Sequence, residues 1–97
     1  MTITKDISGT KARLTVEGRL DTMTAPELEK EIQILTAMDS LELDFSKLDY
    51  ISSAGLRVLL SAHKSFADRD GMVILNANES VLDIFEVTGF KDILTIR

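Results

Sequence analysis

Two adjacent serines, Ser52 and Ser53, stand where a strand pattern changes into a helix pattern. Leu41, Leu43 and Phe45 alternate with polar residues before them, and apolar residues after them recur at the spacing of one helix face. A serine at such a position caps the helix, because its hydroxyl accepts a hydrogen bond from a free backbone N–H. The hydroxyl is also a candidate phosphoryl acceptor. A phosphate adds about −1.5 to −2 charges, and the positive end of the helix dipole tolerates it.

Two aspartates are expected near this turn. Asp44 closes the predicted central strand, and Asp21 follows the strand before it. The carboxyl ends of parallel strands meet the N-termini of the helices, so both carboxylates are expected near Ser53. They either position the acceptor hydroxyl and shape the surface that a kinase reads, or accept backbone N–H groups within a loop. The residues alone leave both roles open.

Gly55 lies in the first turn of the predicted helix, where glycine costs about 1 kcal/mol relative to alanine. A glycine kept there indicates that something approaches the backbone closely. Either a partner or a packing contact inside the domain satisfies this pattern.

No catalytic base is within reach of the two serines. His63, the only histidine, is predicted to be packed and hydrogen-bonded about three turns beyond Ser53, too far to activate that hydroxyl. The run Ser52–Gly55 is not a Gly-x-Ser-x-Gly motif, and no glycine-rich nucleotide loop occurs. We therefore predict no enzymatic activity, no catalytic residue, no metal site and no cofactor.

Length and composition favour a single soluble domain spanning residues 1–97. The absence of cysteine excludes disulfides, thiol catalysis and cysteine-bound zinc, and fits a cytoplasmic protein. A net charge of −5 argues against nucleic-acid binding. Neither a signal peptide nor an apolar run of about 18 residues is present, so we expect no membrane segment.

The N-terminal part of the chain predicts a hairpin. A strand around Ile3, a turn at Ser8–Thr10 and a strand at Lys11–Glu17 are expected to pair antiparallel. The run Gly18–Asp21 is expected to leave the sheet, with Leu20 returning to the core.

A helix follows, and its start resembles a capping box at Thr24–Glu27 with a proline in the first turn. Its buried stripe is Leu28, Ile32 and Leu35. After Ser40, Leu41–Phe45 is predicted as the central strand, parallel to the preceding one. Lys47–Ile51 is predicted as a short connection.

The C-terminal half predicts two more helices. The first runs from Ser53 to about Asp68, and Met72–Leu75 is the next strand. Asn78 is expected to cap a helix over Glu79–Val87, and Gly89 to close it in the left-handed conformation. A short strand or packed tail ends the chain at Ile93–Ile96. Met23, Met38 and Met72 are expected in the core or at its rim. The sum is an α/β fold, a mixed sheet with its helices chiefly on one side.

The run Tyr50–Arg57 resembles the signature of the STAS domain, the family of bacterial anti-sigma factor antagonists. Gly18–Thr22, Leu43–Phe45 and Val87–Phe90 also resemble that family, in the expected order and spacing. The resemblance implies a STAS-like sheet topology and a protein that binds an anti-sigma factor with serine-kinase activity. It further implies that this kinase inactivates the protein by phosphorylation and that a phosphoserine phosphatase restores it.

The match to the signature is incomplete. Many antagonists carry an aspartate just before the serine pair; Ser52 takes that position here, and Ala54 stands where a second hydroxyl often lies. The resemblance makes Ser53 the expected phosphorylation site and Ser52 the alternative. If the second hydroxyl were the required acceptor, Ala54 would mean that the switch is lost. The partner-binding residues that the resemblance implies are Asp21, Asp44, Ser52, Ser53, Ala54, Gly55, Leu56 and Arg57.

Two other functions compete with this phosphorylation switch. One is a constitutive interaction module of the same fold, in which Ser53 is only a cap. The other is a small enzyme with Ser53 as its nucleophile, against which the missing base already counts.

Overall fold

Five strands form one mixed sheet in a computed structural model that describes residues 1–97, and their order in space is β1-β2-β3-β4-β5. β1 pairs antiparallel with β2, and every other neighbouring pair is parallel. The predicted hairpin and the parallel central pair are both confirmed. The strands are β1 (Thr2–Ser8), β2 (Lys11–Leu20), β3 (Ser40–Ile51), β4 (Gly71–Leu75) and β5 (Thr95–Ile96).

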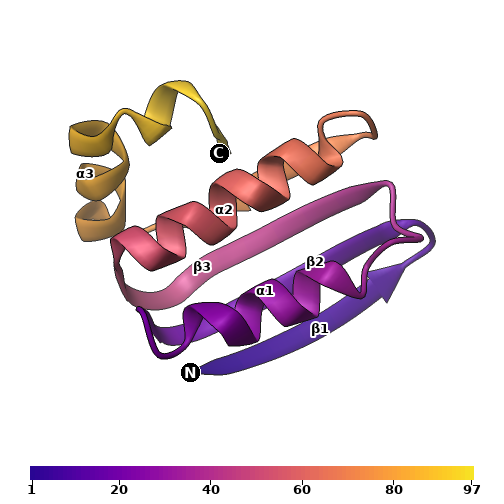
Figure 1. The fold of residues 1–97 in the computed structure, drawn as a ribbon, viewed down its shortest axis with the longest axis horizontal. Helices are drawn as coiled ribbons and strands as arrows, with labels where there is room; N and C mark the ends of the chain where they lie inside the picture. The colour runs from indigo at the N-terminus through magenta and orange to yellow at the C-terminus, as the bar shows by residue number, and fades with distance from the viewer.

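Three α-helices and a short 3₁₀ helix connect the strands: α1 (Ala25–Gln33), α2 (Ser53–Phe66), α3 (Glu79–Thr88) and the 3₁₀ helix Phe90–Asp92. Figure 1 shows α1 and α2 side by side over one face of the strands, with α3 at the end where α2 begins. The expected α/β fold, with its helices chiefly on one side of a mixed sheet, is confirmed. None of these helices combines the length and the apolar character that a membrane crossing requires.

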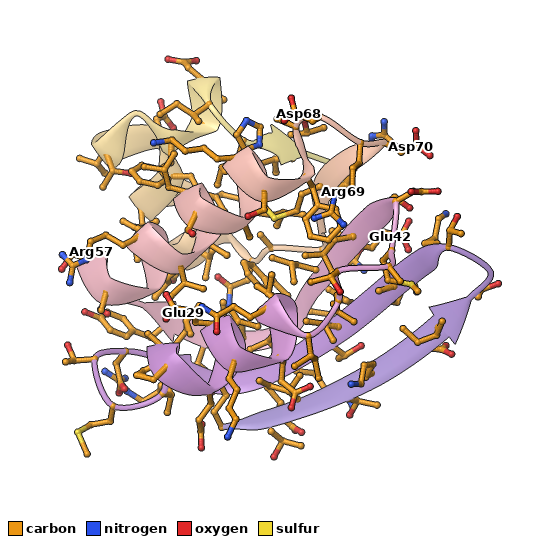
Figure 2. All side chains as sticks on the ribbon, turned by 45° about the vertical axis from the view of Figure 1, so that its right-hand side comes forward. Glu29, Glu42, Arg57, Asp68, Arg69 and Asp70 are labelled. Carbon is orange, nitrogen blue, oxygen red and sulfur yellow. The ribbon has the colours of Figure 1, made fainter.

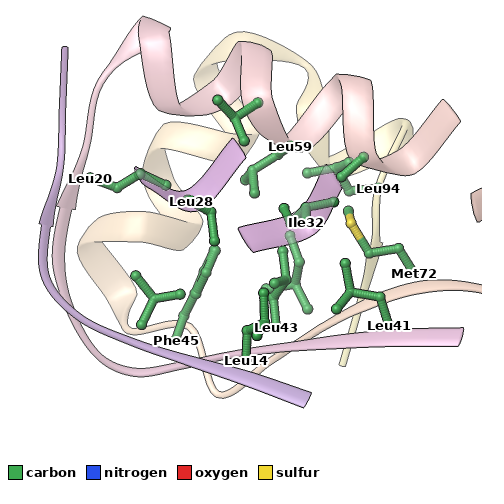
Figure 3. Close-up of a cluster of buried hydrophobic side chains, with 14 of the residues drawn as sticks. Leu14, Leu20, Leu28, Ile32, Leu41, Leu43, Phe45, Leu59, Met72 and Leu94 are labelled. Atoms are coloured by element: carbon green, nitrogen blue, oxygen red, sulfur yellow. The ribbon is translucent and has the colours of Figure 1, made fainter. Parts of the chain in front are cut away.

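The core fills the space between the sheet and the helices, as Figure 3 shows. Leu14, Leu43 and Phe45 point into it from the strands, and Leu28 and Leu59 meet them from the helices, all fully buried. The core contains 23 buried residues, every one hydrophobic. No polar or charged residue is buried, so the burial of apolar surface is what holds the two layers together.

The two central strands are longer than predicted. The connection expected at Lys47–Ile51 is part of β3, and the residues Gly18–Leu20 stay in β2 and pair with it. Twice along this pairing β3 carries one residue more than β2. Such bulges interrupt the alternation of faces: Phe45, Leu48 and Ile51, all buried, are spaced by three. The alternation of apolar and polar residues that predicts a strand is therefore absent from Lys47–Ile51, although these residues belong to β3. Leu20 is buried, as expected.

The C-terminal elements follow their local signals. The Asn78 side chain accepts a hydrogen bond from the Val81 backbone N–H at 2.9 Å, and Gly89 closes α3 in the left-handed conformation. Both predicted caps are confirmed. α2 ends at Phe66, two residues before the predicted end at Asp68.

Gly55 is buried where the first turn of α2 crosses the ends of β2 and β3. A Cβ atom there would lie 2.8 Å from both Ile51 Cγ1 and Leu20 Cγ, closer than packed atoms approach. Of the two explanations for this glycine, the structure supports the packing contact inside the domain.

We expect Gly55→Ala to lower the free energy of unfolding by about 1–3 kcal/mol, the usual cost of overpacking, even though alanine is the better helix former by about 1 kcal/mol. Urea unfolding followed by circular dichroism measures this change. The same substitution in a Leu20→Ala background should cost less, because one of the two clashing side chains is then truncated. A Gly55→Ala protein more stable than the wild type would contradict the packing role.

Candidate functional site

The start of α2 is joined directly to the ends of the two central strands. Ile51 is the last residue of β3 and pairs with Leu20, the last residue of β2. The Ser52 backbone N–H then donates to the Leu20 carbonyl at 2.9 Å. This bond places the β2–α1 loop beside the serine pair, and the serines therefore lie on the rim of the sheet.

Ser52 is the N-cap of α2. Its backbone is extended, and its Oγ accepts a hydrogen bond from the Gly55 N–H at 3.4 Å. Its carbonyl accepts the first helical bond, from Leu56 N–H at 2.9 Å. The sequence left open whether Ser52 or Ser53 caps the helix. In the structure the cap is Ser52, so the hypothesis that Ser53 is only a cap is wrong.

Ser53 is the first residue of α2 and is exposed. Its hydroxyl takes part in none of the side-chain hydrogen bonds at this turn, which involve the Ser52 hydroxyl, the Asp21 carboxylate and the Thr24 hydroxyl. A phosphoryl donor can therefore reach the Ser53 oxygen without breaking an existing contact.

Asp21 holds the β2–α1 loop in a closed hydrogen-bonded turn. Its Oδ1 accepts from the backbone N–H groups of Met23 at 3.0 Å and Thr24 at 3.2 Å. The Thr24 hydroxyl accepts from the Asp21 N–H at 2.9 Å and donates to the Arg19 carbonyl at 2.7 Å. The predicted capping box with Glu27 is wrong, because Thr24 precedes α1 but makes no side-chain cap bond to it.

The pKa of Asp21 reflects these contacts. Burial acts to raise the pKa, but the backbone N–H groups of Thr24 and Met23, the Thr24 hydroxyl and the nearby Arg19 together hold it below the usual 3.8. The carboxylate therefore stays ionised and hydrogen-bonded to the backbone N–H groups of its own loop.

The positions of two side chains beside this turn, Met23 and Arg19, were not correctly predicted from the sequence. Met23 is 85% exposed, because the turn closed by Asp21 lifts it out of the fold, so its expected place in the core or at its rim is wrong. The Arg19 guanidinium lies over the Tyr50 ring, 4.3 Å from its centroid, where the two residues pair across β2 and β3. The spacing of Asp21 and Thr24 was the only signal for the turn. Met72 is buried and Met38 packs against the core, as expected.

Asp44 is not part of this site. It lies within β3 rather than at its end, opposite Leu75 at the end of β4. β3 continues to Ile51 at about 3.3 Å per residue, which puts Asp44 on the order of 20 Å from Ser52. The expectation that Asp44 lies near Ser53 is wrong, because the central strand is longer than predicted.

Asp44 instead fixes the backbone around it and the loop after β4. Its Oδ1 accepts from the Ser46 N–H at 2.9 Å and from Asn76 Nδ2 at 3.3 Å. Burial acts to raise its pKa, but Ser46, Asn76 and the charge of Arg13 together lower it. Asp44 thus has the loop-holding role that was one of its two alternatives.

Ser53 lies on the open surface of the molecule, away from its hollows. Ser53 lines none of the hollows of the molecule; one of about 190 Å³ lies between α1 and α2, against Ile32 and Phe66. His63 is ten positions further along α2, about 15 Å at the helical rise of about 1.5 Å per residue. His63 was predicted to be packed and hydrogen-bonded; its Nδ1 is buried but has no hydrogen-bond partner.

The chain is similar to known proteins over nearly its whole length. A family model described as "Mlab, STAS domain" matches residues 3–95. The anti-sigma-B factor antagonist of Listeria monocytogenes is 29% identical, over 84% of this chain and 75% of that protein. BtrV of Bordetella bronchiseptica, provisionally named an anti-sigma factor antagonist, is 34% identical, over 84% of this chain and 72% of that protein.

Solved structures share the fold. The anti-sigma factor antagonist SpoIIAA in its unphosphorylated form superposes with a TM-score of 0.78 at 15% identity, covering 99% of this chain and 87% of that one. The phosphorylated form of SpoIIAA, from Bacillus, gives a TM-score of 0.77 at 15% identity, covering 99% and 91%. At this identity the likeness concerns the arrangement of strands and helices.

We expect Asp21→Asn to destabilise the protein at pH 7, because it removes the charge that the loop N–H groups stabilise. The folded pKa of Asp21 lies below the unfolded value, so its contribution is complete above about pH 5 and is lost as the pH falls through the folded pKa. Urea unfolding between pH 7 and pH 3 should show the gap between variant and wild type closing in acid. Asp49→Asn, at an exposed position of β3, is the matched control. A gap that is independent of pH would contradict the charged role of Asp21.

Proposed function

Because the chain belongs to the STAS domain family, we propose that it is an anti-sigma factor antagonist controlled by phosphorylation of Ser53. Unmodified, it binds an anti-sigma factor with serine-kinase activity; phosphorylated, it loses that partner until a phosphoserine phosphatase restores it. The names of its relatives and the existence of SpoIIAA in both forms support this proposal. In it, residues 1–97 act as a single STAS domain in the cytoplasm.

The observation that carries the proposal is the division of labour between the two serines. Ser52 caps α2, and its loss would cost about 1 kcal/mol of stability. Ser53 is exposed at the first helical position with no such duty. Phosphorylation of Ser53 therefore leaves the fold intact while it changes the surface, as a reversible switch requires.

The chemistry belongs to the kinase, and this chain is its substrate. The Ser53 Oγ attacks the γ-phosphorus of ATP as the bond between that phosphorus and the β–γ bridging oxygen breaks. ADP leaves with the bridging electrons, and the hydroxyl proton passes to a base of the kinase. The product carries about −1.5 to −2 charges on a surface that had none at this position. A partner docked there meets new bulk and unpaired negative charge, and its affinity falls.

The expected partner-binding residues have different roles in this proposal, and Ser52, which is partly buried, caps α2. Ser53, Ala54 and Arg57 are at least partly exposed and touch the partner in this proposal. Gly55 and Leu56 are buried, and they shape the turn from below. Asp21 acts through the loop that it closes. Asp44 lies on a different part of the sheet, opposite Leu75 of β4, so this proposal gives it no contact at the Ser53 turn.

We expect Ser53→Ala to keep partner binding and resist inactivation, and Ser53→Asp to weaken binding at least tenfold, or about 1.4 kcal/mol, with unchanged stability. The measurement is calorimetric titration with each purified serine-kinase anti-sigma factor of the same organism, with and without ATP. Ser65→Asp, at an exposed position about three turns along α2 and outside the spacing at which it could pair with Arg57, controls for added charge on the helix. Equal binding by the Ser53→Ala and Ser53→Asp proteins would replace the switch with a constitutive interaction module.

A further inference from the structure

Arg57 is an unpaired cation one helical turn beyond Ser53. Both residues are exposed on α2, and Figure 2 shows the Arg57 side chain projecting outward from the first part of that helix. Side chains three and four positions away are the ones that a helical residue can meet. For Arg57 these are Ser53, Ala54, Leu60 and Ser61.

None of these neighbours carries a charge, and Arg57 takes part in none of the ion pairs of the structure. The first turn of α2 also contains no acidic residue, although an acidic residue is the usual stabiliser of a helix start. The guanidinium therefore has no anion to bind until one is added at Ser53.

We propose that Arg57 is the internal partner of phosphoserine at Ser53, binding the phosphate across one turn of α2. This inference rests on the proposed function, in which Ser53 is the acceptor. An anion placed four residues before a cation is the favourable order for a helical pair. The planar guanidinium also matches phosphate oxygens with two parallel N–H donors.

The cation beside this turn and the other exposed cation on α2 are less suited. Arg19 is stacked on Tyr50 and lies 3.9 Å from the Asp21 carboxylate. Lys64 is on α2 but eleven positions from Ser53, about 16 Å along the helix axis. A phosphate on Ser52 would be five positions from Arg57, outside the spacing at which helical side chains face each other.

The pair gives phosphorylation a second effect on the docking surface. In the unmodified protein the Arg57 guanidinium is free to bind a carboxylate of the partner. In the phosphorylated protein it is held by the phosphate within the same helix. The modification thus adds negative charge at Ser53 and withdraws the nearest free cation on α2 at the same time.

The test is a ³¹P NMR titration of protein carrying genetically encoded phosphoserine at position 53, which needs neither the kinase nor the partner. The second pKa of a phosphoserine lies near 6, and a bound guanidinium lowers it by favouring the dianion. We expect Arg57→Gln to raise that pKa by about 0.3 pH units, the size for a helical ion pair. The matched control Lys64→Gln removes one charge from an exposed site on the same helix and should leave the pKa within about 0.1 pH units, because solvent screens it at that distance.

A second pKa unchanged by Arg57→Gln, or changed equally by Arg57→Gln and Lys64→Gln, would overturn the pair. Circular dichroism of each variant confirms that the helix is intact, as expected for substitutions at exposed positions. The proposed function fails in a different experiment: a partner that binds the phosphorylated and unmodified proteins equally would refute the switch and leave the Arg57 pair standing.

Discussion

The contact on which the functional end of the molecule depends is the seating of the first turn of α2 on the ends of β2 and β3. It has two parts: the Ser52 N–H donates to the Leu20 carbonyl, and Gly55 leaves room for the side chains of Leu20 and Ile51. The helix can begin this close to the sheet only because position 55 has no side chain. Ser52 is then used as the cap, and Ser53 is left on the surface with a free hydroxyl.

The start of α2 differs in charge from the chain as a whole. The protein has a net charge of −5, yet α2 begins without an acidic residue and carries Arg57 in its second turn. The nearby carboxylate of Asp21 is occupied by the N–H groups of its own loop. A phosphate on Ser53 would be the first free anion at the helix start. In the proposed switch, a phosphate on Ser53 would stabilise the start of α2 and change the surface on which the partner docks.

The sequence predicted those features that depend on local signals and missed those that depend on pairing between strands. Asn78 and Gly89 bound α3 as expected, because a cap needs only its own neighbours. The end of β3 was missed because bulges space its buried residues by three, and Asp44 was consequently misplaced. Thr24 begins a run that matches a capping box, but its hydroxyl bonds to Asp21 and Arg19 instead. The spacing of residues in the sequence does not distinguish between these two hydrogen-bonding patterns.

The most direct test of the central claim is phosphosite mapping by mass spectrometry on the protein isolated from its native cells, over several growth conditions. It needs no knowledge of the kinase, and it separates two adjacent serines by their fragment ions. We predict phosphate on Ser53 and none on Ser52, whose hydroxyl caps α2. Phosphate on Ser52 alone would contradict the division of labour between the two serines, and an unmodified peptide under every condition would favour a constitutive interaction module.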